Sequence, residues 1–136
     1  MQTGRLRLFG TDLRALGDIG PADGIASNER FTVGPDPRLL VYSRDHQIRC
    51  FDRQSQADTV VARREIARLS HPCLSPDGRW LAVHTVDSKA GTLDFSTTLP
   101  HILPFAPAGD VLVDSGRHAL ATPAIVECGG QMVWLR

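Results

Sequence analysis

A tight-turn sequence between two strand-forming runs constrains this chain more than any other feature. Pro76, Asp77 and Gly78 stand between an apolar-containing approach and the run Trp80–Val83. Proline pre-sets φ for a β-turn, the aspartate side chain caps the turn, and glycine accepts a positive φ. The segment His71–Val86 is therefore predicted to be an antiparallel β-hairpin.

Looser copies of this hairpin occur on both sides of it. In the earlier copy the first strand is Arg30–Val33 and the second is Arg38–Ser43. In the later copy the first strand is His101–Phe105 and the second is Val111–Asp114. The three turns are built from Pro35, Asp36, Pro76, Asp77, Gly78, Pro107 and Gly109. Their prolines at 35, 76 and 107 are 41 and 31 residues apart. A period near 40 residues with four short strands per unit is the pattern of a β-propeller blade.

Further strands are predicted from alternation of apolar and polar residues. The polar turn Arg44–Gln47 leads into a strand at Ile48–Asp52. The apolar residues of the run Thr59–Leu69 fit both a strand pair and a short helix, and its β-branched residues and its length favour a fourth, outer strand. Breaker residues make Gly17–Gly24 a loop. Other short strands are expected at Arg5–Leu8, Thr92–Ser96, Arg117–Thr122, Ala124–Glu127 and Gln131–Leu135, the last two joined by Gly129 and Gly130.

The residues Leu74–Val83 read Leu-Ser-Pro-Asp-Gly-Arg-Trp-Leu-Ala-Val. This segment resembles the Ser-Pro-Asp-Gly-Arg-x-Leu-Ala hairpin shared by TolB-type and WD-type β-propeller repeats. Val33–Asp52 is similar to a second repeat, with Ile48–Asp52 in the place of the strand that ends in Trp-Asp in the WD family. The resemblance covers roughly 90 residues in two good copies and one degenerate copy. It implies blade hairpins and no particular activity.

We therefore expect a single all-β domain over residues 1–136, with antiparallel sheets arranged as a partial or compact β-propeller of three to four blades. A closed propeller needs at least four blades of about 40 residues, more than this chain supplies comfortably. Either the strand at Met132–Leu135 joins N-terminal strands to close a small ring, or the sheets form an open propeller. The exposed edges of an open propeller would pair with a partner.

Composition narrows the class of partner and the cellular location. Lys plus Arg and Asp plus Glu both number 15, so the formal net charge is zero, which argues against a nucleic-acid partner held by bulk charge. All basic residues except Lys89 are arginine, which suits a protein interface. The N-terminus lacks a signal-peptide core and no run has the length of a membrane span. We expect a cytoplasmic protein with no membrane partner.

Residues that would carry catalysis or hold a metal are not recognised in the sequence. The five histidines have no metal-ligand spacing, and the three widely spaced cysteines indicate neither a disulfide framework nor a zinc site. No serine lies in a nucleophile elbow. The hairpin at Ser75–Trp80 differs from the sialidase Asp-box in the position of its tryptophan and in the glycine directly after Asp77. We expect no catalytic residues, no metal and no cofactor.

These expectations favour a non-catalytic module that binds and occludes another protein, for example a toxin or effector, as a bacterial immunity protein or antitoxin does. Residues expected at loop tips are the binding candidates: Asp18, Asp23, Arg44, Asp45, His46, Asp87 and Lys89. One alternative is a hydrolase or lyase whose site is assembled from propeller loops. Another is half of a homodimeric propeller.

Overall fold

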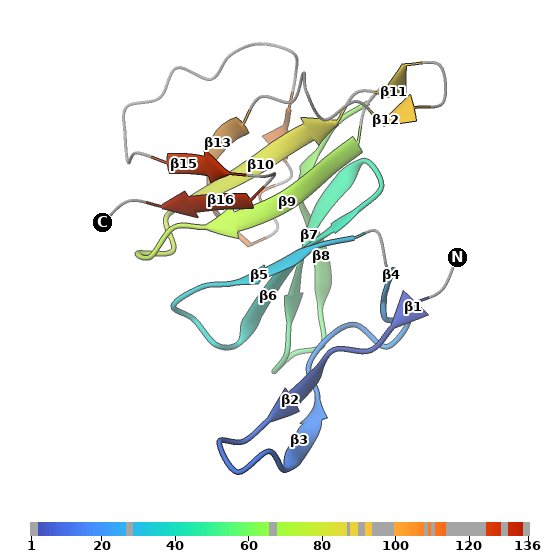
Figure 1. Ribbon diagram of the computed structural model, residues 1–136, viewed down its shortest axis with the longest axis vertical. Coiled ribbons are helices and arrows are strands. Elements are labelled where there is room, and N and C mark those ends of the chain that lie inside the picture. The colour runs from blue at the N-terminus through green and yellow to red at the C-terminus, as the bar shows by residue number, and fades with distance from the viewer. Residues whose placement is uncertain are drawn as a thin grey trace.

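The computed structural model describes residues 3–26, 29–65, 68–86, 88–89, 92–93, 100–107, 109, 111–113, 125–128 and 131–134. Over these ranges the chain forms strands and no helix, so the all-β class is confirmed (Figure 1). The strands are β1 (Thr3–Gly4), β2 (Arg7–Phe9), β3 (Ala15–Asp18), β4 (Ile25–Ala26), β5 (Phe31–Val33), β6 (Leu39–Arg44), β7 (Gln47–Asp52), β8 (Asp58–Arg63), β9 (Arg68–Leu74), β10 (Trp80–Val86), β11 (Ser88–Lys89), β12 (Thr92–Leu93), β13 (Pro100–Pro104), β14 (Val111–Leu112), β15 (Ile125–Cys128) and β16 (Gln131–Trp134).

The largest sheet is an antiparallel meander of β5, β6, β7 and β8 with one further strand added at its edge. Phe31 lies opposite Tyr42, and Val41 lies opposite Cys50, so the order along the chain is also the order across the sheet. Alternation places successive side chains of each strand on opposite faces. Strand β14 completes the sheet by pairing in parallel with β8.

The second sheet consists of β9, β10 and β13, with β10 in the centre. Leu81 pairs with Leu74 on β9 and with Leu103 on β13. The ladder between β9 and β10 shifts register between Ala82 and His84, where His71 has a positive φ of 51°. This bulge bends β9 at the middle of the sheet.

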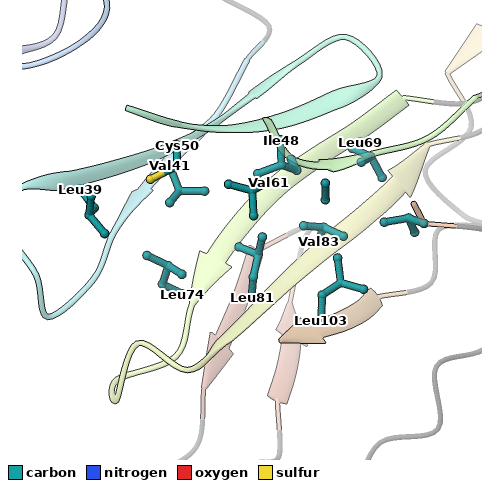
Figure 2. Close-up of a cluster of buried hydrophobic side chains, with 12 residues drawn as sticks. Leu39, Val41, Ile48, Cys50, Val61, Leu69, Leu74, Leu81, Val83 and Leu103 are labelled. Carbon is teal, nitrogen blue, oxygen red and sulfur yellow. The ribbon is translucent and has the colours of Figure 1, made fainter. Parts of the chain in front are cut away.

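The main hydrophobic core lies between these two sheets, whose apolar side chains point toward one another (Figure 2). Its buried residues are Leu39, Val41, Ile48, Cys50, Val61 and Ala62 from the first sheet, Leu69, Leu74, Leu81, Val83 and Leu103 from the second, and Val113 directly after β14. Fully burying one side chain of this kind contributes about 1.5–3 kcal/mol. The face-to-face contact of the two sheets is therefore the main source of stability in the described residues.

The opposite face of the first sheet is covered by the N-terminal segment. Leu40, Tyr42 and Phe51 form a smaller cluster there with Ile25, and Leu6 packs against it. The hairpin of β2 and β3 extends beyond this cover and projects away from both sheets (Figure 1). The chain thus places one layer on each side of the meander.

The remaining strands form short two-stranded sheets. Cys128 lies opposite Gln131 in the hairpin of β15 and β16, and β16 lies against β9 (Figure 1). The N-terminal pairs are β1 with β4 and β2 with β3. Within the described ranges β16 pairs only with β15, and no sheet closes into a ring.

The third predicted hairpin is wrong. The predicted first strand forms β13, which pairs with β10, and the predicted second strand forms β14, which pairs with β8 in parallel, so the two do not pair with each other. The turn itself exists, since the Gly109 amide donates to the Ala106 carbonyl at 3.0 Å. The two flanking strands go to different sheets because edges of both sheets are available to them. The described sheets are antiparallel as expected, apart from the parallel pairing of β14 with β8 at this place.

Two predicted boundaries also differ from the structure. The run Thr59–Leu69 is not a single strand, because β8 ends at Arg63 and β9 begins at Arg68. The predicted loop at Gly17–Gly24 loses its first two residues to β3, where pairing with β2 overrides the glycine signal. The predicted strand Arg117–Thr122, the turn at Gly129 and Gly130, and most of Thr92–Ser96 lie outside the described residues.

Candidate binding surface

The loop-tip candidates gather in part around the turn between β6 and β7. Arg44, Asp45 and His46 share this turn, and Asp45 has a positive φ of 51°. Arg44 donates from Nη1 to Asp23 at 3.0 Å and from Nη2 to the Gly24 carbonyl at 2.8 Å. Arg44 therefore ties the N-terminal segment to the sheet, which is a structural role for a residue predicted to bind a partner.

The other loop-tip candidates lie elsewhere. Asp18 ends β3 and forms ion pairs with Arg5 at 3.2 Å and Arg7 at 3.7 Å. Lys89 lies in β11, where its backbone pairs with Thr92, and Asp87 is outside the described residues. The structure thus joins Asp23 to Arg44 but does not bring all seven candidates into one site.

A partly buried polar network on the first sheet escaped sequence reasoning. The Tyr42 hydroxyl donates to Asp58 Oδ2 at 2.6 Å, and Arg49 Nε donates to Asp58 Oδ1 at 3.0 Å. Burial, followed by the hydrogen bond and charge of Asp58, raises the pKa of Tyr42 well above its ordinary value. A tyrosine that stays protonated is a hydrogen-bond donor and a poor base at neutral pH. The network links three neighbouring strands, because Tyr42 lies in β6, Arg49 in β7 and Asp58 in β8. The sequence gives no sign of it, because these three residues come together only in the folded sheet.

The predicted turn residues have closely similar local geometry. Asp36 Oδ1 accepts the Arg38 amide at 3.0 Å, and Asp77 Oδ1 accepts the Arg79 amide at 3.1 Å. The Ser75 hydroxyl also donates to Asp77 Oδ1 at 2.6 Å. The Ser75 hydroxyl and then the Arg79 amide hold the pKa of Asp77 below its ordinary value.

Tertiary structure brings these turns together at one end of the two sheets. Gly78 has φ of +71°, and a Cβ built there would lie 2.9 Å from Pro35 Cγ. A groove of about 330 Å³ opens between the turns. It is lined by turn residues and by the end of the core: Gly34, Pro35, Asp36, Arg38, Leu39, Leu74, Asp77, Gly78, Phe105 and Pro107. Pro76 and Gly109 belong to the same turns but do not line it.

Large apolar side chains are exposed in the N-terminal part of the chain. The exposed fractions are 37% for Leu8, 53% for Phe9, 81% for Leu13, 62% for Leu16, 48% for Phe31 and 59% for Val33. We call these six residues the N-terminal apolar surface. Phe31 and Val33 lie opposite Tyr42 and Leu40, so they share the sheet face that the N-terminal segment covers. Sequence reasoning missed this surface, although the adjacent apolar residues Leu8 and Phe9 must point to opposite sides of their strand.

Buried His84 and half-buried His71 lie close to one another on the second sheet. The His71 and His84 rings are 5.6 Å apart between centroids, and Ser70 Oγ lies 2.9 Å from His71 Nδ1. Among the described residues no group of three His, Cys, Asp or Glu side chains is placed to hold a metal ion. In the same part of the chain, no helix is long and apolar enough to cross a membrane.

Comparison with known proteins adds no relative. No family model, no curated protein and no solved structure matches this chain.

Proposed function

We propose that this chain is a non-catalytic protein-binding module that occludes a partner protein through its N-terminal apolar surface. The observation that carries the proposal is the exposure of six large apolar side chains in residues 8–33. Together they present on the order of 500 Å² of apolar side-chain surface, since a side chain of this size presents roughly 150–200 Å² when fully exposed. A standard interface buries about 800 Å² per partner, a little over half of it apolar. The surface therefore suits a protein partner.

Charged residues beside this surface support a specific contact. Arg5, Arg7 and Asp18 surround the base of the projecting hairpin, and Asp12 and Arg14 lie at its tip. A polar and charged rim around exposed apolar residues is the usual organisation of a protein interface. With zero net charge the chain has no excess of positive charge for nucleic acid. We propose a cytoplasmic protein partner, and a toxin or effector inhibited by occlusion is the narrower form of the proposal.

The propeller arrangement is part of the same proposal. The four-stranded meander of β5 to β8 has the strand order of a single blade. The two best turn copies have similar aspartate caps and lie side by side, as equivalent turns of neighbouring blades would. We propose that the meander and the second sheet are adjacent blades related to TolB-type or WD-type repeats.

Affinity capture with matched variants tests the binding proposal. The double variant Phe9→Asp/Leu16→Asp places two charges on the apolar surface, and the control Gln54→Asp/Gln56→Asp adds the same charge in the exposed turn between β7 and β8. We expect a partner captured from native lysate by the wild type and the control to be lost by the hairpin variant. Calorimetry on the purified pair should then show affinity weakened at least tenfold. A partner bound equally by all three proteins would overturn the proposed surface.

A further inference from the structure

The projecting hairpin lacks the support that a hairpin needs. Strands β2 and β3 form a sheet of their own, and within the described residues neither pairs with a third strand. All four residues of β3 are exposed. A two-stranded hairpin is marginally stable in water unless it packs against something else. The apolar side chains of this hairpin therefore call for a covering surface.

We propose that the cover is a second copy of this chain, packed hairpin against hairpin across a two-fold axis with the two β3 strands antiparallel. This inference rests on the proposed function, because it names the partner that the hairpin part of the N-terminal apolar surface fits. In the dimer Phe9 and Leu16 of both copies are buried. A second copy and a foreign partner would therefore compete for the hairpin, whereas Phe31 and Val33 stay uncovered in the dimer.

Charge order along β3 favours a second copy. Arg14 immediately precedes the strand, and Asp18 ends it. Antiparallel strands place the start of one beside the end of the other, so Arg14 of each copy lies near Asp18 of its partner and joins the cluster that Asp18 forms with Arg5 and Arg7 of its own chain. Two opposite-charge pairs then form by symmetry, and residues of both signs on one patch make it complementary to itself.

The exposed area is sufficient for an association of moderate strength. Phe9, Leu13 and Leu16 expose on the order of 300 Å² of apolar surface per copy, by the side-chain areas used above. With its polar rim, the interface of two copies would bury about 1,000 Å² in total, near the smallest area of a specific complex. Zero net charge removes long-range repulsion between copies. The contact is made by side chains, because the bulge between Leu8 and Phe9 interrupts the regular ladder of the hairpin.

A charge-swap mixing experiment tests this arrangement. Arg14→Asp creates two Asp–Asp contacts in its homodimer, and Asp18→Arg creates two Arg–Arg contacts. A mixture of the two variants restores both opposite-charge pairs in the heterodimer. The control Glu65→Arg changes the chain charge by the same amount as Asp18→Arg at an exposed position between β8 and β9.

Light scattering of the purified chain between about 5 and 200 µM should detect a monomer–dimer equilibrium in the wild type and the control. Each charge variant alone should raise the dimer Kd about tenfold at low salt, and mixing should restore it. Leu16→Asp should be monomeric with an unchanged circular dichroism spectrum. A wild type that is monomeric throughout, or charge variants that mixing does not rescue, would overturn the proposal.

The two proposals fail separately. Oligomeric state is measured on the isolated chain, whereas the proposed function is measured by partner capture. A monomeric wild type whose capture still depends on the hairpin overturns the dimer and leaves occlusion standing.

Discussion

Replacing Gly78 by alanine tests whether the first two repeat turns touch. Gly78 has φ of +71°, a conformation that costs an L-residue about 1–2 kcal/mol. The new Cβ would also lie 2.9 Å from Pro35 Cγ, which is part of a closed ring and cannot rotate away. Overpacking of this kind costs about 1–3 kcal/mol. We expect Gly78→Ala to lower the free energy of unfolding by roughly 2–5 kcal/mol, from the sum of these two effects.

A double-mutant cycle separates the two contributions. Pro35→Ala removes the ring carbons that the new Cβ meets and leaves the backbone strain at Gly78 unchanged. The double variant should therefore recover about 1–3 kcal/mol relative to the sum of the single variants. The assay is urea unfolding followed by tryptophan fluorescence and circular dichroism.

The matched control is Gly20→Ala. A Cβ at Gly20 would meet Leu40 and Leu6 at 3.7 Å, which is ordinary van der Waals contact, and its φ is not positive. We expect this variant to change the free energy of unfolding by less than about 1 kcal/mol. If Gly78→Ala and Pro35→Ala are additive within about 0.5 kcal/mol, the turns do not touch and the reasoning is refuted.

Three further predictions concern the core and its polar network. Tyr42→Phe removes the 2.6 Å hydrogen bond from the Tyr42 hydroxyl to Asp58 and should lower the free energy of unfolding, measured in urea, by about 1–3 kcal/mol. A loss below about 0.5 kcal/mol would show that this hydrogen bond does not stabilise the fold. Leu81→Ala leaves a cavity at a fully buried central position and should lower the free energy of unfolding by about 2–5 kcal/mol. Leu13→Ala on the exposed hairpin should lower it by less than about 0.5 kcal/mol. Equal losses in the two variants would contradict the difference in burial between these residues. Burial, then nearby carboxylates, raises the pKa of Cys50 from 9.0 to about 11, so the folded state favours the neutral thiol. The neutral thiol therefore adds to the free energy of unfolding below pH 9, by on the order of 3 kcal/mol at most, and this stabilisation is lost between about pH 9 and 11. In Cys50→Ala the free energy of unfolding should change less with pH over this range.

The candidate residues illustrate how polar side chains are divided between structure and binding. Arg44 and Asp23 looked like free loop tips, yet they hold the N-terminal segment on the sheet. Large apolar residues of the projecting hairpin, in contrast, are exposed. Alternation predicts that a residue faces one side of a strand, but it does not say whether that side is covered.

Local chemistry determined the central turn and the meander of this protein. Pro76, Asp77 and Gly78 encode their turn through a fixed φ, a side-chain cap and a positive φ, and these effects act within four residues. The same holds for the meander of β5 to β8, whose neighbours along the chain are neighbours in the sheet. The all-β class and the two good hairpin copies could therefore be predicted from the sequence.

Tertiary structure alone decided where the non-local strands and turns meet. Nothing local to β13 and β14 specifies that one joins β10 and the other joins β8, because an extended strand presents pairing groups to any free edge. The contact between Gly78 and Pro35 joins turns 41 residues apart, and the exposure of Leu13 depends on what the rest of the chain leaves uncovered. The turn sequence encodes a hairpin by itself. It does not decide which hairpins pack together or which one projects from the fold. These depend on which sheet edges and apolar faces the rest of the chain leaves free.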